Sequence, residues 1–252
     1  MIPPDVRRVL PPDTAATWER LASLLPDPLY LAGGTAIAVH LKHRESHDLD
    51  FFYHEASVDL DRLERELTQA LGLAVTERSL GTLNGVISKT KVQFLHADRS
   101  APQRRLDRPT TVAGLGIAGM RDLLAMKLRV IGDRGELRDY LDIMRIEQDT
   151  TYTVEQGLSY FVARFQPRDP NAAVLHVLRG LGYLGDVEDD LLLPLKRRAI
   201  ESYWMTRQPQ ILREIERTGI QPLAADQPRL SGIDDPAASQ SEPGHDTPDI
   251  GI

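Results

Sequence analysis

The chain has 252 residues, of which 41% are hydrophobic and 27% charged, and its formal net charge is −7. No apolar run approaches the roughly 20 residues that span a bilayer, and the first five residues are neither basic nor apolar, so we expect no membrane segment and no signal peptide. The absence of cysteine excludes disulfides, a thiol nucleophile and thiolate-bound zinc. We therefore expect a cytoplasmic globular protein.

The acidic charge is concentrated near the carboxyl end. Residues 221–252 hold one basic and six acidic residues, a net charge of −5, which leaves −2 for residues 1–220. Residues 221–252 are rich in Pro, Ser, Gly and Asp, and they contain too few apolar side chains to offset the entropy of ordering. We predict a disordered acidic tail over 221–252. A near-neutral body with local basic clusters is compatible with a nucleic-acid partner.

The first part of the chain alternates between helical and extended patterns. Three segments have apolar residues at helical spacing and are predicted as helices: 14–25, 35–41 and 59–71. Five runs have a strand-like pattern and are predicted as strands: 29–32, 48–53, 73–78, 82–88 and 91–96. This part is expected to form a mixed sheet with flanking helices.

Beyond about residue 112 the pattern becomes helical throughout. Five segments are predicted as helices: 117–131, 135–146, 154–165, 172–184 and 190–219. We therefore predict an α+β fold, in which an α/β domain over 1–112 is followed by an all-helical domain over 113–220.

Gly33-Gly34-Thr35 lies between a predicted strand and a predicted helix. At such a position the backbone N–H groups that open the helix can hold a phosphate. A Gly-Gly pair is also common in ordinary turns, so the function of this segment depends on what surrounds it.

Asp48 and Asp50 alternate with Leu49 and Phe51 in the predicted strand. Alternation places both carboxylates on one face, with their Cα atoms about 6 to 7 Å apart. Adjacent carboxylates repel, and the arrangement is normally stabilised by a divalent cation or a shared proton. Mg²⁺ suits oxygen ligands and phosphate substrates. The alternative is a solvated strand face.

The two segments together resemble a known signature. Gly33-Gly34-Thr35, followed by Arg44-x-Ser46-x-Asp48-Leu49-Asp50-Phe51, is similar to the active-site signature of the polymerase β-type nucleotidyltransferase superfamily. The second segment has the form found in its AbiEii/AbiGii toxin branch, which includes MenT-like toxins. A later block resembles the downstream motif of that branch: Lys127, Arg134-Gly135 and Arg138-Asp139-Tyr140-x-Asp142-Ile143.

Lys127 also stands out without the resemblance. Helical periodicity places it among Leu123, Leu124 and Leu128, where an ammonium group is costly unless it reaches solvent or meets an anion. A nucleotide phosphate is one such anion, and a lysine at a helix edge is the alternative. Asp139 and Asp142 share a helix face and could contact Lys127, orient a base or face solvent.

The resemblance implies a nucleotidyltransferase toxin of a toxin–antitoxin system. It implies a polymerase β-like domain before the helical domain, Mg²⁺ or Mn²⁺ as cofactor, and transfer of a nucleoside monophosphate from an NTP to RNA, such as the 3′ end of tRNA. A cognate antitoxin is the implied protein partner. Four residues are expected to be catalytic, the first two as metal ligands: Asp48, Asp50, Lys127 and Asp142. Seven are expected to bind the nucleotide: Gly33, Gly34, Thr35, Arg44, Ser46, Lys127 and Asp139.

One position departs from the superfamily pattern. A third carboxylate usually comes from a later strand, and here that place is taken by Gln93, which carries no charge. A single metal ion on Asp48 and Asp50 is therefore the expected arrangement, unless another acid substitutes. The alternatives are a nucleotidyltransferase that modifies a small molecule or a protein, and a catalytically weakened protein that binds NTP or an antitoxin.

Overall fold

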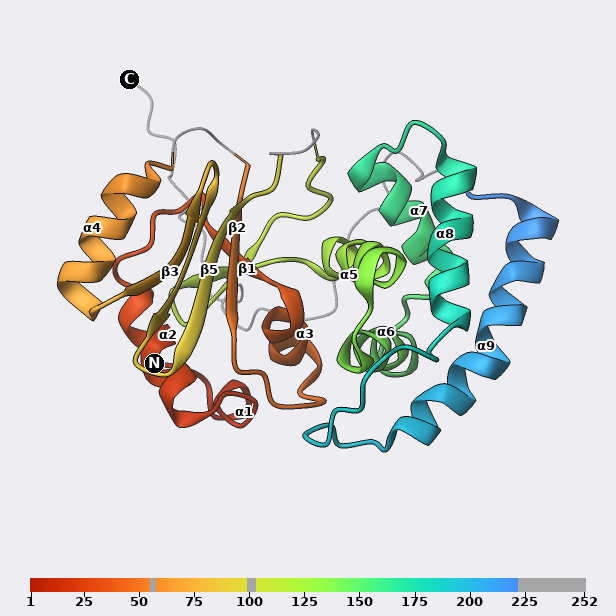
Figure 1. Ribbon diagram of the computed structural model, residues 1–252, viewed down its shortest axis with the longest axis horizontal. Helices are drawn as coiled ribbons and strands as arrows, with labels where there is room; N and C mark the ends of the chain where they lie inside the picture. Colours follow the sequence, from red (N-terminus) through yellow and green to blue (C-terminus); the bar gives the residue numbers. More distant parts are fainter. Residues whose placement is uncertain (55–57, 99–102, 222–252) are drawn as a thin grey trace, which may run out of the picture.

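The computed structural model describes residues 1–54, 58–98 and 103–221, and Figure 1 shows how they are arranged. Apart from Gln221, the tail predicted over 221–252 lies outside the described residues. A mixed sheet occupies one half of the molecule, and helices occupy the other half (Figure 1). The α+β fold class expected from the sequence is thereby confirmed.

The sheet has seven strands in the described residues, in the order β3-β4-β5-β2-β1-β7-β6. Their bounds are β1 Tyr30–Ala32, β2 Leu49–Tyr53, β3 Ala74–Ser79, β4 Thr82–Ile87, β5 Thr90–His96, β6 Thr110–Val112 and β7 Leu115–Ile117. β2 pairs antiparallel with β1 and parallel with β5, which makes the sheet mixed. β2 thus lies in the middle of the sheet, with β1 on one side and β5 on the other.

Helices flank the sheet and form the second half. Their bounds are α1 Pro4–Arg7, α2 Pro12–Leu21, α3 Gly33–Leu41, α4 Leu60–Leu71, α5 Met120–Arg134, α6 Leu137–Asp149, α7 Val154–Phe165, α8 Pro170–Gly182 and α9 Arg197–Thr218. In Figure 1, α2 and α4 lie on one side of the sheet, whereas α3 lies between the sheet and the helical half. None of the described helices is long and apolar enough to cross a membrane.

The alternation of β2 decides which side chains face the core. Leu49, Phe51 and Tyr53 are buried, and the Phe51 ring stacks on Phe94 of β5 with centroids 5.4 Å apart. Burial of such large apolar side chains holds this face of the strand in place. Asp50 must therefore point to the opposite face, toward α3 and the helical half.

Several elements differ from the sequence prediction, and two of the differences concern the helical half. The helix predicted over 117–131 begins only at Met120, because Leu115–Ile117 forms β7 and pairs parallel with β1. The domain boundary predicted at residue 112 thus falls inside the β6–β7 hairpin. The last helix begins at Arg197 rather than at 190, and Pro194 precedes it in an irregular segment. Proline limits the conformation of its own residue and of the residue before it.

Candidate active site

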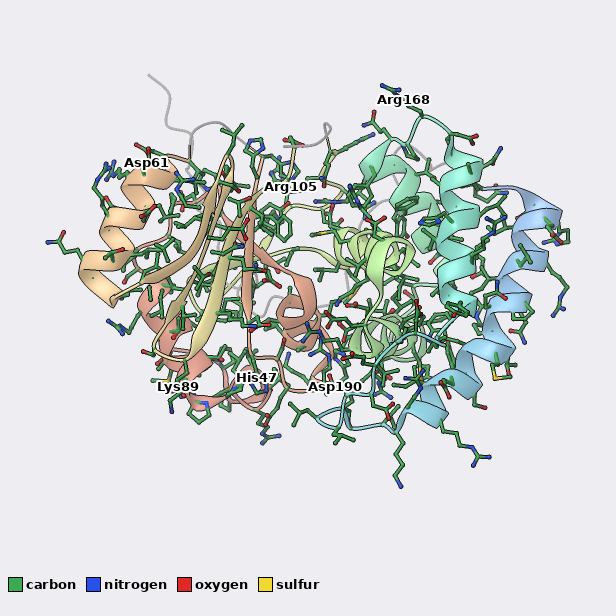
Figure 2. All side chains as sticks on the ribbon, viewed as in Figure 1. His47, Asp61, Lys89, Arg105, Arg168 and Asp190 are labelled. Atoms are coloured by element: carbon green, nitrogen blue, oxygen red, sulfur yellow. The ribbon has the colours of Figure 1, made fainter. Side chains whose placement is uncertain are left out.

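A cavity of about 630 Å³ is lined by both halves of the molecule. Its volume lies in the range of small-molecule sites. The sheet half contributes residues from α3, β2, β5 and the segment before β2, and the helical half contributes residues from α5, α6 and the segment before α9. Figure 2 labels His47 and Asp190, which line the cavity from the two halves.

Glycine is needed twice where β1 passes into α3. Gly33 has φ +66°, in the left-handed region, and a Cβ atom at this position would collide with the carboxylate of Asp50. A Cβ atom at Gly34 would collide with the guanidinium of Arg44. The missing side chains therefore allow a carboxylate and a guanidinium to approach the first turn of α3.

The amino end of α3 carries no side-chain cap. Its first backbone N–H groups have no partner within the helix, and the helix dipole makes this end favourable for an anion. Thr35, in the first turn, donates a hydrogen bond to the backbone carbonyl of Asp48, and its hydroxyl lies 2.7 Å from that of Ser46. These contacts fix the segment before β2 against α3, with Thr35 and Ser46 both in the cavity wall.

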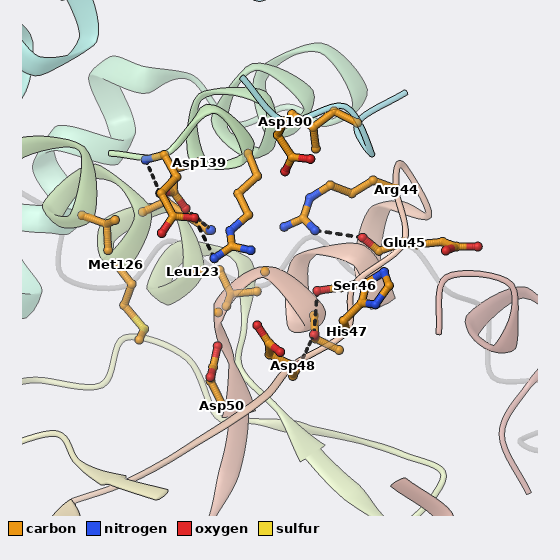
Figure 3. A pocket seen from close by; sticks show the side chains of 18 of the residues that line it. Arg44, Glu45, Ser46, His47, Asp48, Asp50, Leu123, Met126, Asp139 and Asp190 are labelled. Atoms are coloured by element: carbon orange, nitrogen blue, oxygen red, sulfur yellow. Dashed lines mark hydrogen bonds and ion pairs between the residues drawn. The ribbon is translucent and has the colours of Figure 1, made fainter. Parts of the chain in front are cut away.

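Asp48 and Asp50 form the acidic part of the cavity (Figure 3). Burial, and then the negative charge of Asp48, raises the pKa of Asp50 to about 6, although Lys127 and Arg138 act in the opposite direction. Within the described residues, no donor forms a hydrogen bond or ion pair with either carboxylate. Two adjacent carboxylates without a compensating partner provide the hard oxygen ligands that a divalent cation prefers.

No group of three or more His, Asp or Glu side chains that could hold a metal ion occurs among the described residues. A metal ion bound by the described residues would therefore have fewer than three such side chains as ligands. Mg²⁺ in phosphate-transferring sites is commonly bound through one or two carboxylates together with substrate phosphates and water. Asp48 and Asp50 fit that smaller donor set.

The opposite wall contains a second, fully paired acidic cluster on α6. The carboxylate of Asp142 accepts two hydrogen bonds from Arg44, at 2.7 and 2.8 Å, and one from His43 Nε2 at 2.7 Å. Lys127 Nζ lies 2.8 Å from Asp142 and 2.5 Å from Asp139. Among the three possibilities open for Asp139 and Asp142, contact with Lys127 is the one observed.

The structure places Asp142, for which a catalytic role is predicted, behind the lining of the cavity. Asp142 is fully buried and is not among the residues that line the cavity. Burial alone would raise its pKa, but the charges of Lys127 and Arg44 hold the pKa of Asp142 below its ordinary range. A carboxylate saturated by three donor side chains has no capacity left for a proton or a metal ion, so Asp142 positions Arg44 and Lys127.

Asp139 has a related structural role. One of its oxygens accepts a hydrogen bond from the backbone N–H of Glu136 at 2.9 Å and completes the capping box of α6, while the other meets Lys127. Asp139 lines the cavity, but a carboxylate beside a phosphate would be repelled. Its contacts in the structure hold Lys127, and its predicted contact with the nucleotide stays a prediction.

The remaining predicted residues are brought together. Eight of them line the same cavity: Gly33, Gly34, Thr35, Arg44, Ser46, Asp48, Asp50 and Lys127. Gln93, at the place of the usual third carboxylate, pairs in register with Asp50 on the neighbouring strand and also lines it. Burial would lower the pKa of the Arg44 guanidinium, but Asp142, and then Asp139 and Asp190, raise it above its ordinary value. Asp190 stands near Arg44 in Figure 3.

Three contributions were missed from the sequence. Arg138 lines the cavity from the first turn of α6, and its place in the downstream motif was the available signal. His43 supports Asp142 through a side chain that is entirely buried, and nothing in the local sequence distinguished it from its neighbours His40 and His47. The segment 190–194 closes one side of the cavity but was expected to be helix.

Comparison with known proteins gives a family match over part of the chain. The family model of the nucleotidyl transferase AbiEii toxin, of type IV toxin–antitoxin systems, matches residues 18–90. This segment contains the glycine turn of α3, Asp48 before β2 and Asp50 on β2. The resemblance to the AbiEii family that the sequence motifs suggest is therefore confirmed over residues 18–90.

The proteins that match most of the chain are only distantly similar to it in sequence. An uncharacterized protein of Aquifex aeolicus (strain VF5) is 24% identical over 199 residues, which cover 78% of this chain and 91% of that protein. A candidate nucleotidyltransferase of H. pylori aligns with a TM-score of 0.49 and 19% identity over 81% of this chain and 94% of its own. MenT4, a nucleotidyltransferase toxin from Mycobacterium tuberculosis H37Rv, aligns with a TM-score of 0.40 and 15% identity over 84% of this chain and 91% of its own.

Proposed function

We propose that this protein is a nucleotidyltransferase toxin that transfers a nucleoside monophosphate from an NTP to a hydroxyl group of RNA, with Mg²⁺ or Mn²⁺ as cofactor. The observation that carries the proposal is the composition of one cavity. An unpaired carboxylate couple, Asp48 and Asp50, lies beside the uncapped amino end of α3 and beside the cations of Arg44 and Lys127. The family match over residues 18–90 supports the same activity.

The triphosphate is bound on the α3 side of the cavity. Backbone N–H groups at Gly34 and Thr35 donate to phosphate oxygens, helped by the helix dipole. Arg44 and Lys127 supply positive charge there, while Asp142 and Asp139 keep both side chains in place. Ser46, beside Thr35, adds a hydroxyl to the same wall.

Asp48 and Asp50 would hold the divalent cation, which would neutralise charge at the phosphate oxygens when bound. The acceptor hydroxyl oxygen forms a new bond to the α-phosphorus as the bond between that phosphorus and the α,β-bridging oxygen breaks. Pyrophosphate leaves with the bonding electron pair, and the hydroxyl proton passes to water. The chain's own residues contribute mainly by positioning the NTP and by electrostatic stabilisation.

The acceptor and the protein partner follow from the resemblance. Toxins of the AbiEii type imply an RNA acceptor, of which the 3′ end of tRNA is the expected case, and a cognate antitoxin. Neither the base of the NTP nor the RNA species is fixed by these residues. Both are outcomes of the experiment that follows.

The test is incubation of the full chain with each α-labelled NTP, Mg²⁺ and total RNA, followed by a denaturing gel. We expect labelled RNA with at least one NTP and no label with Asp50→Asn. The matched control is Asp61→Asn, because Asp61 is an exposed aspartate on α4 at the far side of the sheet (Figure 2). If Asp61→Asn also lost transfer, the loss in Asp50→Asn would reflect general damage to the protein.

Two results would contradict the proposal. One is transfer that is unchanged in Asp50→Asn, which would remove the site. The other is NTP binding by the wild-type protein without pyrophosphate release in the presence of RNA, which would favour a catalytically weakened nucleotide-binding protein.

A further inference from the structure

The sheet order separates two unlike sides of the cavity. β2, which carries Asp50, lies between β1, which leads into the Gly33-Gly34 turn, and β5, which carries Gln93. Gly33 lies directly against the Asp50 carboxylate, and Gln93 is the register partner of Asp50 on the other side. Asp50 therefore stands between the glycine turn and Gln93.

The glycine side is polar. The guanidinium of Arg44 lies against Gly34, and the amino end of α3 opens there. A helix amino end and an arginine both favour an anion, and Asp142 holds Arg44 in place. This side is where the triphosphate is bound in the proposed function.

The other side is neutral. Gln93 and Leu95 alternate on β5 and, with Phe52 of β2, line the cavity, and Phe52 is the register partner of Leu95. Leu123 and Met126 of α5 complete the apolar part of the wall. In Figure 3 these two α5 residues lie on the Asp50 side of the cavity, away from Glu45 and His47.

In-line displacement assigns a role to the neutral side. The attacking and leaving oxygens lie on opposite sides of the phosphorus during phosphoryl or nucleotidyl transfer. When pyrophosphate departs toward the glycine turn, the attacking hydroxyl has to arrive from the side of Gln93. The reaction proposed above thus requires an acceptor subsite where Gln93, Phe52 and Leu95 are found.

We propose that Gln93, Phe52 and Leu95 form this acceptor subsite and that it receives an unpaired nucleobase at the end of the acceptor RNA. The inference rests on the proposed function and specifies its acceptor. It assigns Gln93 a contact with the acceptor, at the position where the superfamily usually has a third carboxylate.

The chemistry of the three side chains favours a base over a cationic acceptor. The half-buried Phe52 ring offers a face on which an unstacked base can pack, as aromatic side chains do in single-stranded RNA recognition. The Gln93 carboxamide presents donors and an acceptor in one plane, which matches the edge of a base. Within the described residues, no group forms a hydrogen bond with this carboxamide. A polycationic acceptor would instead require an acid at this place.

The experiment compares Gln93→Leu and Phe52→Ala with the wild-type full chain. Two quantities are measured: the Kd for the preferred NTP with Mg²⁺, and the KM for total RNA in the labelled-transfer assay. We expect the KM for RNA to rise about tenfold or more in both variants, while the Kd for NTP stays within about twofold of the wild type. Gln69→Leu, at an exposed glutamine of α4, is the matched control and should change neither quantity.

Three outcomes would overturn the inference. The first is an unchanged KM for RNA in both variants. The second is a parallel rise in the Kd for NTP, which would place the three residues in the nucleotide site. The third is faster transfer in Gln93→Glu, which would identify the position as a lost third carboxylate. A wild-type protein that binds NTP but labels no RNA contradicts the proposed function instead, so the two failures are distinguishable.

Discussion

Two aspartate pairs, one at the cavity and one that reaches behind its lining, have opposite electrostatic character. The carboxylates of Asp48, just before β2, and Asp50, on β2, have no hydrogen-bond or ion-pair partner within the described residues, and the pKa of Asp50 rises to about 6. On α6, Asp139 and Asp142 are both paired with Lys127, and the pKa of Asp142 lies below its ordinary range despite complete burial. Two similar sequence motifs thus give different pairs: Asp48 and Asp50 lack a cation within the described residues, whereas Asp139 and Asp142 hold cations in place.

The largest expected effect is on the paired cluster. Asp142→Ala leaves Arg44 and Lys127 buried without their shared partner, so the free energy of unfolding should fall by about 3 to 5 kcal/mol. Urea denaturation followed by circular dichroism measures the change. Asp61→Ala, at an exposed ion pair, is the control, and a loss at Asp142 no larger than at Asp61 would contradict the structural role.

Substitution of Asp50, whose carboxylate has no partner within the described residues, should change the free energy of unfolding in the opposite direction. Because the folded-state pKa of Asp50 is raised from 3.8 to about 6, its ionisation opposes folding as pH rises through this interval, and the full cost is present above pH 6. Without added metal, Asp50→Asn should therefore stabilise the protein at pH 8 by about 2 to 3 kcal/mol.

The pH dependence of that gain is its check. The stability difference between Asp50→Asn and the wild type should shrink as pH falls through about 6 toward 4. Thermal unfolding at a series of pH values in chelator measures it. A gain that grows on acidification would mean that Asp50 is stabilised by a partner, and the comparison between the two couples would fail.

A smaller effect is expected at His43, which supports Asp142 from the other side. Loss of its 2.7 Å hydrogen bond in His43→Ala should cost about 2 kcal/mol, because the acceptor is a buried charged group. His43→Gln can restore a donor and should recover part of the loss. Urea titrations of both variants make the measurement, and equal losses would show that the hydrogen bond itself contributes nothing.

The smallest effect concerns Arg138, at the edge of the cavity. Arg138 is half exposed and paired with Glu136 at 2.7 Å, so Arg138→Ala should leave stability within about 0.5 kcal/mol of the wild type. Its charge reaches the site, and we expect the Kd for NTP to rise by about two- to fivefold. Arg145→Ala, at another partly exposed arginine of α6 paired with an aspartate, is the control and should bind NTP as the wild type does.

The local fold could be predicted where one face of an element is apolar. α4 shows this directly: Leu60, Leu63 and Leu67 are buried on one face, Asp59 caps the amino end, and Gly72 ends the helix with φ +68°. The short strands β6 and β7 could not be predicted in the same way. Each has only three residues, and β7 exists because it pairs with β1, which is distant in the sequence.

The site was predicted in part. The two carboxylates and the glycine turn are close in sequence, and the resemblance to a family signature brought them into one prediction. The roles of Asp139 and Asp142 depend on Arg44, about a hundred residues earlier, and on Lys127 of another helix. Periodicity showed only that the two acids share a face of α6.

The sequence by itself determined that the folded body is nearly neutral and that most of the net charge of −7 belongs to residues 221–252. It also determined which residues carry oxygen ligands and cations. The tertiary structure decided which acids are neutralised, because the free energy of a buried charge depends on the neighbours that surround it. Those neighbours come from the segment between α3 and β2, from α5 and from α6, and folding alone brings these elements together.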